Sequence, residues 1–350
     1  MDYKSSGVDI DVGTEVVERV KRLAKSTFTD GVLSDIGTFG GLFRPELSGM
    51  DEPVLVASAD GVGTKLKVVF VAGVHSTIGL DLVNHCVNDV VAQGARPIFF
   101  LDYLATGRLS PEVSTSVVEG IAKGCKENGC ALLGGETAEM PGFYADGEYD
   151  LAGFVVGIVD RARIIDGRTI VPGDVIIGLP STGLHTNGYS LARRILFDEL
   201  ALNLGSVVKE IGCTVGEELL RPHCSYQSTV RPVIETGYVK GIAHITGGGL
   251  TDNVPRVLPA RCKAVIDRKT WPVPPVFEFL RDRGNVSIDE MYRTFNMGIG
   301  LTVVCSRANA RSVLAKLVSC GEVEASCIGE IREGTPGVEY TEVDFLGQSL

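Results

Sequence analysis

Four regions of the chain combine acids, glycines and small polar side chains in ways that suit the binding of a cation or an anion. The first is DGVGTK, residues 60–65, in which Asp60 ends an apolar run and Lys65 follows a glycine turn. A P-loop needs four residues between its first glycine and its Gly-Lys-Ser/Thr end. Here one residue separates the two glycines and threonine precedes lysine, so the stretch is not a P-loop. It offers a carboxylate, a turn and a positive charge.

The second region is 81–92, whose spacing predicts a helix with a broad apolar stripe. Asp89 lies at the edge of that stripe, and the opposite face gathers Asp81, Asn84, His85 and Asn88. A solvent-exposed helix face would explain these residues. So would a metal site in which Asp89 supplies a carboxylate and Asn88 assists as a neutral ligand. The residues alone leave both interpretations open.

The third region is CALLGGETAEMPGFY, residues 130–144, where an apolar strand runs into Gly134 and Gly135 and then Glu136 and Glu139. In α/β proteins ligands bind where strands end, and glycines let the backbone approach a ligand closely. A surface loop with two glutamates is the alternative interpretation.

The fourth region comprises two glycine-rich loops, at 181–191 and 244–249. The first, STGLHTNGYSL, places hydroxyl and amide donors around His185 and leads into a predicted helix, whose N-terminus would attract an anion. His185 could donate to a phosphate, act as a general acid or serve the fold. The second loop, HITGGG, repeats the order of strand, glycines and helix. Its alternative is a tight connection that needs positive φ.

Together these regions fit a magnesium–nucleotide better than a sugar, a peptide or a flavin, because Mg²⁺ takes a few carboxylates together with phosphate oxygens and water. The net charge of −11 argues against non-specific binding to nucleic acid or to an anionic membrane. It does not exclude anionic ligands, since a bound divalent cation reverses the local charge.

Strands and helices alternate along the chain, which predicts an α/β or α+β fold. Strands are expected at 53–59, 97–105, 130–136, 151–159, 174–180, 263–268 and 299–305, and helices at 14–25, 81–95, 110–129, 187–200 and 310–321. The length of 350 residues suits two domains. Turn signals at 166–168 and 171–174 favour a division into domains 1–168 and 169–350.

The nine cysteines include no CxxC pair, which predicts reduced thiols rather than a disulfide or metal framework. The N-terminal residues MDYKSSGVDID lack the apolar core of a signal peptide. No run approaches the roughly 20 apolar residues of a membrane span. We therefore expect a cytoplasmic protein that does not enter a membrane.

Seven motifs occur together in one order: GVDIDVG (7–13), DGVGTKLK (60–67), CVNDVVAQGARPIFFLDYLATG (86–107), GGETAEMPGFY (134–144), STGLHTNGYSL (181–191), HITGGG (244–249) and MYRTFNMGIG (291–300). From residue 7 to about 300 the chain thereby resembles the phosphoribosylformylglycinamidine cyclo-ligase family, also called the AIR synthetases. Departures are mild, such as Thr186 where serine is usual and the varied sequence after the glycines of 247–249.

The resemblance implies two α/β domains of the AIR-synthetase type. The N-terminal sheet domain would pair with its twin, so that a homodimer forms the nucleotide sites, and the segment with Asp9 and Asp11 would fold over the site. The implied reaction is ATP-dependent ring closure of formylglycinamidine ribonucleotide, which gives aminoimidazole ribonucleotide, ADP and phosphate.

The resemblance also implies roles for the residues in these motifs. Asp60, Asp89 and Glu136 would hold Mg²⁺, with Glu139 nearby, and Lys65 would bring positive charge to the ATP phosphates. The residues expected to contact the nucleotide are Gly61, Gly63, Thr64, Asn88, Gly134, Gly135 and Thr137. Those expected to bind phosphate or to stabilise the activated oxygen are His185, Thr186, Asn187, Thr246, Gly247 and Gly248.

Related proteins of the same fold are alternatives. Selenophosphate synthetases usually carry a reactive cysteine or selenocysteine near the N-terminus, whereas the first cysteine here is Cys86. The amidotransferase that makes the substrate is far longer. Two further alternatives of this fold are thiamine-phosphate kinase and a hydrogenase-maturation dehydratase. The remaining ones are another kinase or ligase of a small amide and a non-catalytic nucleotide-sensing dimer.

Overall fold

The computed structural model describes residues 10–342, which form two compact units. Unit 1 contains the described residues up to Val90 together with 95–162, and unit 2 contains 91–94 and the described residues from Arg163 onward. The division expected between residues 168 and 169 lies slightly further along the chain. Asp9 is outside the described residues, and Asp11 lies in the first turn of α1.

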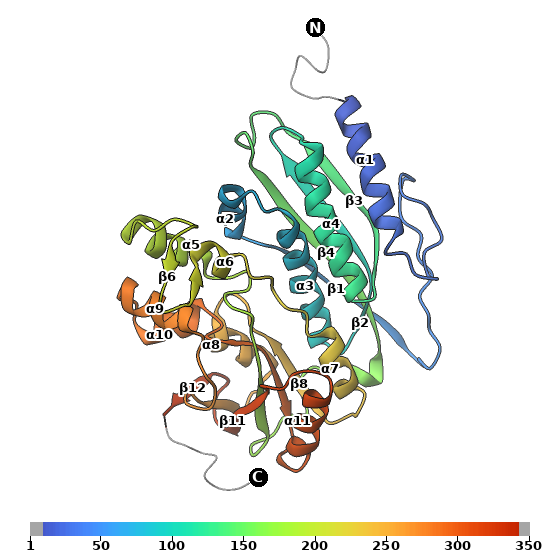
Figure 1. The fold of residues 1–350 in the computed structure, drawn as a ribbon. Coiled ribbons are helices and arrows are strands. Elements are labelled where there is room, and N and C mark those ends of the chain that lie inside the picture. Colours follow the sequence, from blue (N-terminus) through green and yellow to red (C-terminus); the bar gives the residue numbers. More distant parts are fainter. Residues whose placement is uncertain (1–9, 343–350) are drawn as a thin grey trace. The chain divides into compact units, whose positions relative to one another are not determined.

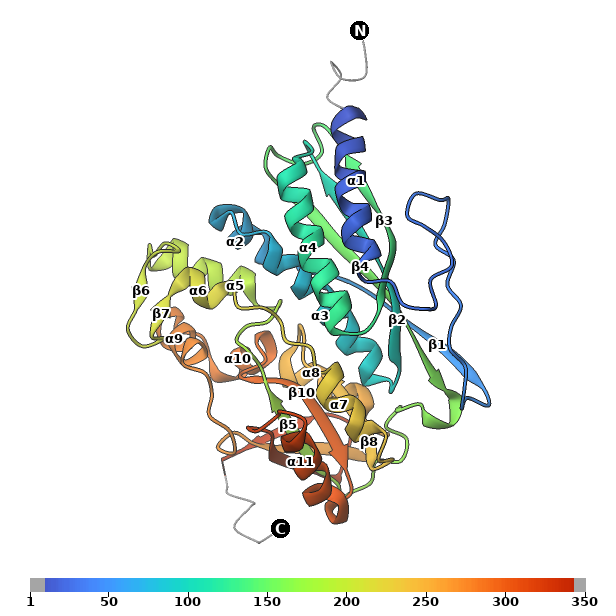
Figure 2. The same ribbon diagram turned by 45° about the vertical axis from the view of Figure 1, so that its right-hand side comes forward.

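Unit 1 is a four-stranded sheet with α1, α3 and α4 on one face (Figures 1 and 2). The strand order is β1-β4-β2-β3, and β4 runs antiparallel to both of its neighbours while β2 and β3 are parallel. The strands are β1 Pro53–Gly61, β2 Arg96–Thr106, β3 Ala131–Glu139 and β4 Tyr149–Asp160; the helices are α1 Ile10–Lys25, α2 Lys65–Ala72, α3 Ser76–Ala92 and α4 Pro111–Glu127.

Glycines fix the position of α3, because they occupy the points where this helix meets its neighbours. A Cβ atom at Gly153 of β4 would lie 2.9 Å from the Leu82 side chain of α3, and one at Gly120 of α4 would lie 1.9 Å from the backbone oxygen of Ser76. Any larger residue at these points would push the helix away. Helix α3 is therefore held tightly on the sheet, and it carries several candidate site residues.

Unit 2 is built on a six-stranded sheet of order β12-β9-β11-β5-β10-β8, with a separate pair β6-β7. Its paired strands are antiparallel except for β12 with β9. Strand β10 is buried along its whole length, which explains its continuous apolar sequence. The strands are β5 Val175–Pro180, β6 Val207–Val208, β7 Cys213–Thr214, β8 Val239–His244, β9 Cys262–Asp267, β10 Ile299–Cys305, β11 Ser326–Glu333 and β12 Val338–Thr341.

The helices of unit 2 are mostly short. Helix α7 packs against α11, and α11 packs on β5, while α8 contacts both α10 and β12. The α-helices are α5 Tyr189–Arg193, α6 Val215–Leu219, α7 Gln227–Ile234, α8 Gly249–Asn253, α9 Pro275–Gly284, α10 Ile288–Thr294 and α11 Ala310–Ser319.

The predicted elements are present with small shifts at their ends. The seven expected strands are β1 to β5, β9 and β10, so the α/β class is confirmed. The helix expected at 187–200 is instead the short α5 followed by a π-helical turn, Arg194–Glu199. Strands β8, β11 and β12 were not expected, because glycines and charged residues interrupt their apolar patterns.

Within residues 10–342, none of the helices combines the length and apolar character that crossing a membrane requires. All nine cysteines lie in this range as free thiols, most of them buried.

Candidate active site

Lys65 and Asp81 form a buried ion pair in unit 1. Lys65 Nζ lies 2.7 Å from Asp81 Oδ2, and both side chains are 0% exposed. Because Lys65 begins α2 and Asp81 lies on α3, the pair ties these two helices together. Burial lowers the pKa of Lys65, although the Asp81 carboxylate opposes this effect. The lysine expected to face phosphates is therefore enclosed by its own unit in this structure.

The glycine turn before Lys65 lies at the surface. Gly63 and Thr64 are exposed, and Gly63 has a φ of +55°, which glycine adopts without strain. The nearest exposed lysine is Lys67, whose Nζ lies 2.5 Å from Glu148 Oε1. The turn thus presents Gly63 and Thr64, rather than the Lys65 ammonium, to a ligand.

Asp60 ends β1 as a charged and accessible carboxylate. Its side chain is 44% exposed, and His85 Nε2 of α3 lies 2.9 Å from Asp60 Oδ2. The backbone N–H of Gly61 donates to Asp60 Oδ1 at 2.7 Å. Partial burial acts to raise the pKa of Asp60, but the His85 hydrogen bond and charge and the Gly61 donor outweigh it and hold this pKa below its usual value. Asp60 is therefore ionised at neutral pH.

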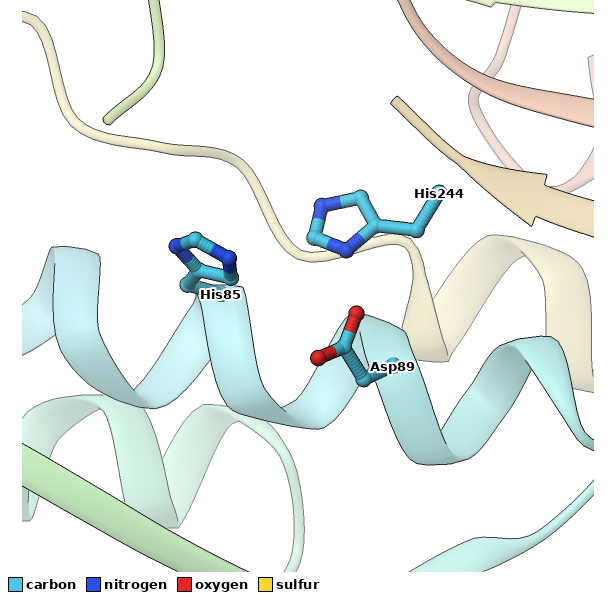
Figure 3. A group of neighbouring side chains, drawn as sticks. All are labelled: His85, Asp89 and His244. Atoms are coloured by element: carbon cyan, nitrogen blue, oxygen red, sulfur yellow. The ribbon is translucent and has the colours of Figure 1, made fainter. Parts of the chain in front are cut away.

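Asp89 lies one helical turn beyond His85 on the same side of α3 (Figure 3). Its Oδ2 accepts a hydrogen bond from Ser58 Oγ at 2.8 Å, and its side chain is half-buried. Ser58 and Asp60 are two residues apart on β1, so they face the same side of the sheet. Two carboxylates therefore gather where β1 ends beside α3, close enough for their charges to interact.

The remaining polar residues of α3 are buried. Asn84 Oδ1 accepts a hydrogen bond from Asn128 Nδ2 at 2.9 Å, and Asn88 is 0% exposed. The interpretation of this face as solvent-exposed is wrong, because its polar groups meet partners on α2, α4 and β1. The polar face of α3 is instead a network that holds Asp60 and Asp89 in place.

Glu136 lies apart from Asp60 within one chain. The sheet register aligns one row of residues across the four strands: Asp60, Gly153, Asp102 and Gly135. At roughly 4.8 Å per strand, the two ends of this row are about 14 Å apart. Because side chains alternate along a strand, Glu136 faces the side opposite to Asp60. A single chain therefore brings Asp60 and Asp89 together, but not Glu136.

The row also contains a buried acid, Asp102, that was not selected from the sequence. A Cβ atom at Gly135 would lie 2.2 Å from Asp102 Oδ1, so this glycine makes room for the carboxyl group. Burial raises the pKa of Asp102 to about 7, and the charge of Glu136 adds to the rise. The signal that could have revealed it is an acid inside the apolar run PIFFLDYLA.

The rest of β3 is accessible in part. Gly134 and Thr137 are half-buried, and Glu136 is exposed. Glu139 Oε1 accepts the backbone N–H of Leu109 at 2.7 Å, so this glutamate fixes the chain before α4. Among the two expected glutamates, Glu136 is the one presented at the surface.

The loop 181–188 of unit 2 is held by a side chain from far along the sequence. Asn296 Nδ2 donates to the carbonyl of Gly183 at 2.8 Å, and Asn296 Oδ1 accepts from Ser181 Oγ at 3.0 Å. A Cβ atom at Gly188 would lie 2.2 Å from the Phe295 ring. The motif at 291–300, to which the sequence assigned no role, therefore positions this loop.

His185 sits in this loop in a strained conformation. It is buried and has a φ of +61°, a region that residues other than glycine rarely adopt. A Cβ atom at Gly300 would lie 2.5 Å from His185 Cε1 and 2.0 Å from Tyr226 Oη. Gly300 is therefore the residue that lets the imidazole lie against β10. Strain of this kind persists only where the surrounding structure determines it.

The two glycine loops of unit 2 meet. A Cβ atom at Gly247 would lie 3.3 Å from Asn187 Oδ1, so the loops 181–191 and 244–249 are neighbours. Thr186, which follows His185, is buried and its Oγ1 lies 3.2 Å from His223 Nδ1.

Asn253 of α8 shapes the second of these loops. Its Nδ2 donates to the carbonyls of Thr246, Gly247 and Gly249, at 3.4, 3.1 and 2.9 Å. Gly248 has a φ of +97° and Gly249 a φ of +58°, so a tight connection explains both of these glycines. Gly247 has no positive φ, and it is the member of the run that is most suited to a ligand.

Several residues around the His185 loop were not found from the sequence. His223, Cys224 and Tyr226 precede α7 and surround the imidazole, and Asn253 and Asn296 fix the loops. Asn253 and Asn296 had a weak signal, since both stand in or beside quoted motifs. His223 and Cys224 had none, because RPHCSY is neither periodic nor glycine-rich.

Comparison with protein families identifies both halves of the chain. The family described as AIR synthase related protein, N-terminal domain, matches residues 46–159, and the corresponding C-terminal domain matches residues 171–341. The chain is 54% identical over 342 residues to a phosphoribosylformylglycinamidine cyclo-ligase of Syntrophotalea carbinolica, covering 97% of each. It is 51% identical over 343 residues to that of Brevibacillus brevis, covering 98% of this chain and 99% of the relative.

Solved structures share the fold at low sequence identity. Thiamine-monophosphate kinase from Stenotrophomonas maltophilia superimposes with a TM-score of 0.67 at 20% identity, covering 94% of this chain and 96% of the kinase. The hydrogenase maturation protein HypE in complex with ATP gives 0.62 at 19% identity, covering 91% of this chain and 89% of HypE. At these identities the likeness shows the fold alone.

Proposed function

The chain belongs to the phosphoribosylformylglycinamidine cyclo-ligase family, and from that membership we propose how its own residues carry out the reaction. The enzyme is a ligase of purine biosynthesis that cyclises formylglycinamidine ribonucleotide to aminoimidazole ribonucleotide with ATP.

The chemistry has two stages. The formyl oxygen of the substrate takes the γ-phosphoryl group of ATP, and ADP leaves. The amidine nitrogen then attacks the formyl carbon, the C–O bond breaks to release phosphate, and the nitrogen loses a proton. Because the second stage is intramolecular, the protein's main tasks are to position two reactants and to neutralise charge on the phosphoryl group.

Asp60 and Asp89 are the residues we assign to Mg²⁺. Their donor set fits the ion, since Mg²⁺ takes one or two carboxylates together with phosphate oxygens and water. The ionised, exposed Asp60 and the half-buried Asp89 lie at the end of the same strand. When bound there, the ion neutralises charge on the phosphates of ATP. Ser58 and His85 hold the two carboxylates in position.

The glycine turns of unit 1 contact the nucleotide in this proposal. Those contacts come from backbone and hydroxyl groups at Gly61, Gly63, Thr64, Gly134, Gly135 and Thr137. Asn88 lies beside the metal in this proposal. Lys65 acts indirectly, since its ammonium is paired with Asp81. Its task is to fix the turn that presents Gly63 and Thr64.

The two loops of unit 2 bind phosphate or the oxygen that is being activated. Asn187 and Gly247 are neighbours there. The other residues that we assign to this phosphate-binding region are His185, Thr186, Thr246 and Gly248. Backbone N–H groups and amide donors stabilise an oxygen as negative charge develops on it.

We propose a homodimer formed through the face of the unit 1 sheet opposite α1, α3 and α4. Antiparallel sheets that face water usually carry polar residues on that side. This face instead presents Leu55, 64% exposed, and Phe154, 44% exposed, together with Ala57 and Ala59. Glu136 lies on this face, whereas Asp60 and Asp89 lie on the other. Because β1 is an edge strand, a second copy that reaches past this edge is the route by which a Glu136 carboxylate can join them.

Subunit complementation tests the dimer. Asp60→Asn and Glu136→Gln are each expected to be nearly inactive alone. Unfolded and refolded together, they are expected to recover about a quarter of the wild-type rate, because half of the dimers would be mixed and each would hold one intact site. No recovery, with dimers present by light scattering, would place Glu136 outside the metal site.

The observation that carries the proposed mechanism is the ionised Asp60 beside Asp89 at the end of β1. The direct test incubates the protein with formylglycinamidine ribonucleotide, ATP and Mg²⁺ and measures the aminoimidazole product. ATP consumption that leaves a phosphorylated, uncyclised product would indicate a kinase. Nucleotide binding without substrate-dependent hydrolysis would indicate a sensor. The free thiols further support placing the enzyme in the cytoplasm.

A further inference from the structure

We propose that Cys224 and the backbone N–H of Thr182 fix His185 as a neutral imidazole whose ring proton is on Nδ1. His185 then serves the reaction as a hydrogen-bond donor and not as a proton-releasing acid, and Cys224 is a positioning residue that acts through it. The inference deepens the proposed function and rests on it for its catalytic consequence, whereas the tautomer itself rests on geometry within unit 2.

The first donor is the backbone of the loop. The N–H of Thr182 points at His185 Nε2 with a separation of 3.2 Å between the two nitrogens. A backbone N–H can only donate, so Nε2 must offer its lone pair. An imidazole with a proton on Nε2 would set two N–H groups against each other. The proton of the neutral ring therefore lies on Nδ1.

The second donor is the thiol of Cys224, whose Sγ lies 3.5 Å from the same His185 Nε2. Burial raises the pKa of the Cys224 thiol to about 12, so the sulfur keeps its proton at neutral pH. Since Nε2 carries no proton, a hydrogen bond within this pair can run only from the S–H group to Nε2, which then shares its lone pair between the two donors. Two donors converge on one ring nitrogen, and both favour the unprotonated form of that nitrogen.

The plane of the ring is fixed by its neighbours. The His185 and His223 rings stack with their centroids 4.0 Å apart and their planes 20° from parallel. His223 is itself held, with Nδ1 3.2 Å from Thr186 Oγ1 and Nε2 3.1 Å from His244 Nε2. Gly300 has no side chain, and the edge of the His185 ring lies in the space that this leaves. The imidazole therefore has little freedom to rotate and exchange its two nitrogens.

A neutral donor suits the reaction proposed for this loop. An imidazole that donates from Nδ1 can polarise a phosphoryl or formyl oxygen without releasing its proton. Of the roles that the sequence left open for His185, hydrogen-bond donation to an oxygen is the one that this geometry favours, over general acid catalysis. The contact between Nε2 and Thr182 occurs in a residue whose φ is +61°.

The test reads the tautomer directly by NMR. The chain has five histidines, so ¹⁵N-histidine labelling of the whole protein gives few ring signals, and His185→Gln identifies the one of interest. Long-range proton–nitrogen correlations are expected to show a protonated Nδ1 and an unprotonated, hydrogen-bonded Nε2 in the wild-type protein. A protonated Nε2 on His185 would overturn the proposal.

Variants of the thiol separate positioning from folding. Cys224→Ala is expected to give a mixture of His185 tautomers and a kcat about fivefold lower, the scale of one neutral hydrogen bond. Cys224→Ser keeps a donor and is expected to restore the single tautomer and most of the rate. Cys320→Ala, which changes a cysteine at the end of α11, is the matched control and should change neither.

The role of Cys224 and the proposed function can be overturned by different results. Cys224→Ala with an unchanged His185 spectrum and an unchanged kcat would overturn the role of Cys224. A wild-type protein that showed the Nδ1 tautomer but made no aminoimidazole product would remove the proposed function and leave the tautomer assignment intact.

Discussion

Unit 1 and unit 2 position their candidate site residues by different means. In unit 1 the residues stand on β1 and α3, and the helix is held at glycine contacts and by a buried ion pair. In unit 2 they stand on two loops, which Asn253 and Asn296 hold by hydrogen bonds to backbone carbonyls. A site on a helix inherits the rigidity of the fold, whereas a site on loops depends on a few individual contacts.

The difference predicts different consequences of mutation. Changes that loosen α3 should lower the stability of unit 1 as well as the rate. Changes that free a loop of unit 2 should lower the rate more than the stability.

The largest effect is expected for the buried ion pair. Asp81→Asn removes the charge that compensates Lys65, and a buried uncompensated charge costs about 3–5 kcal/mol. Urea unfolding followed by circular dichroism should show this loss in the free energy of unfolding. Asp146→Asn, at an exposed site of the same unit, is the matched control and should unfold like the wild-type protein.

A double variant separates a structural role of Lys65 from a direct contact with phosphate. Lys65→Met with Asp81→Leu replaces the pair by apolar side chains, and such replacements are often neutral or stabilising. We expect the double variant to fold and to bind ATP within a few-fold of the wild-type affinity. A well-folded double variant that had lost ATP binding would show that the Lys65 ammonium reaches the nucleotide.

The next effect concerns the carboxylates. Asp60→Asn or Asp89→Asn is expected to lower turnover about a hundredfold, the scale lost with one electrostatic stabiliser, while circular dichroism and thermal unfolding change little. The rates are compared at saturating Mg²⁺. Near-normal turnover in both variants would remove these two residues from the metal site.

A smaller effect is expected in unit 2. Gly300→Ala would place a methyl group 2.5 Å from His185 Cε1 and 2.0 Å from Tyr226 Oη. We expect kcat to fall about tenfold because the imidazole must shift, with a loss of about 1–3 kcal/mol in stability from overpacking. Gly337→Ala is the control, since its nearest neighbour is an atom of Thr335 at 3.8 Å. Equal rates in both variants would mean that turnover does not depend on the position of the His185 imidazole.

The sequence predicted the local positions of two candidate site residues. Asp89 at the edge of an apolar stripe and Asp60 at the end of a strand follow from periodicity, and both are placed as expected. The separation of Glu136 from Asp60 could not be predicted, because it depends on strand order, and the chain order of β1, β2, β3 and β4 differs from their order in the sheet.

Other features depend on contacts between distant residues. The burial of Lys65 requires Asp81 to lie opposite it, and the imidazole of His185 depends on Gly300 and Cys224, which are far away in the chain. A sequence shows where a glycine stands, but it does not show which neighbouring group occupies the space that a side chain would fill. The resemblance located these motifs, and the structure supplied the reasons for several of their glycines.

The smallest effect tests how tightly β1 holds Asp89. Ser58→Ala removes the hydroxyl that donates to Asp89 Oδ2 at 2.8 Å. A hydrogen bond to a charged group contributes about 1.5 kcal/mol at the lower end of its range. We therefore expect the Mg²⁺ concentration that gives half-maximal rate to rise about tenfold, with kcat at saturating Mg²⁺ within twofold of the wild-type value. Asp89 stays in place in this variant, because α3 is fixed by its glycine contacts.

The control for this variant is Ser319→Ala, a serine at the exposed end of α11 that should alter neither quantity. An unchanged Mg²⁺ dependence in Ser58→Ala, combined with a hundredfold loss in Asp89→Asn, would show that the helix alone orients the carboxylate. That result would strengthen the contrast with the loops of unit 2. A large fall in kcat at saturating Mg²⁺ would instead mean that Asp89 needs β1 to reach its working position, and unit 1 would then depend on single contacts as unit 2 does.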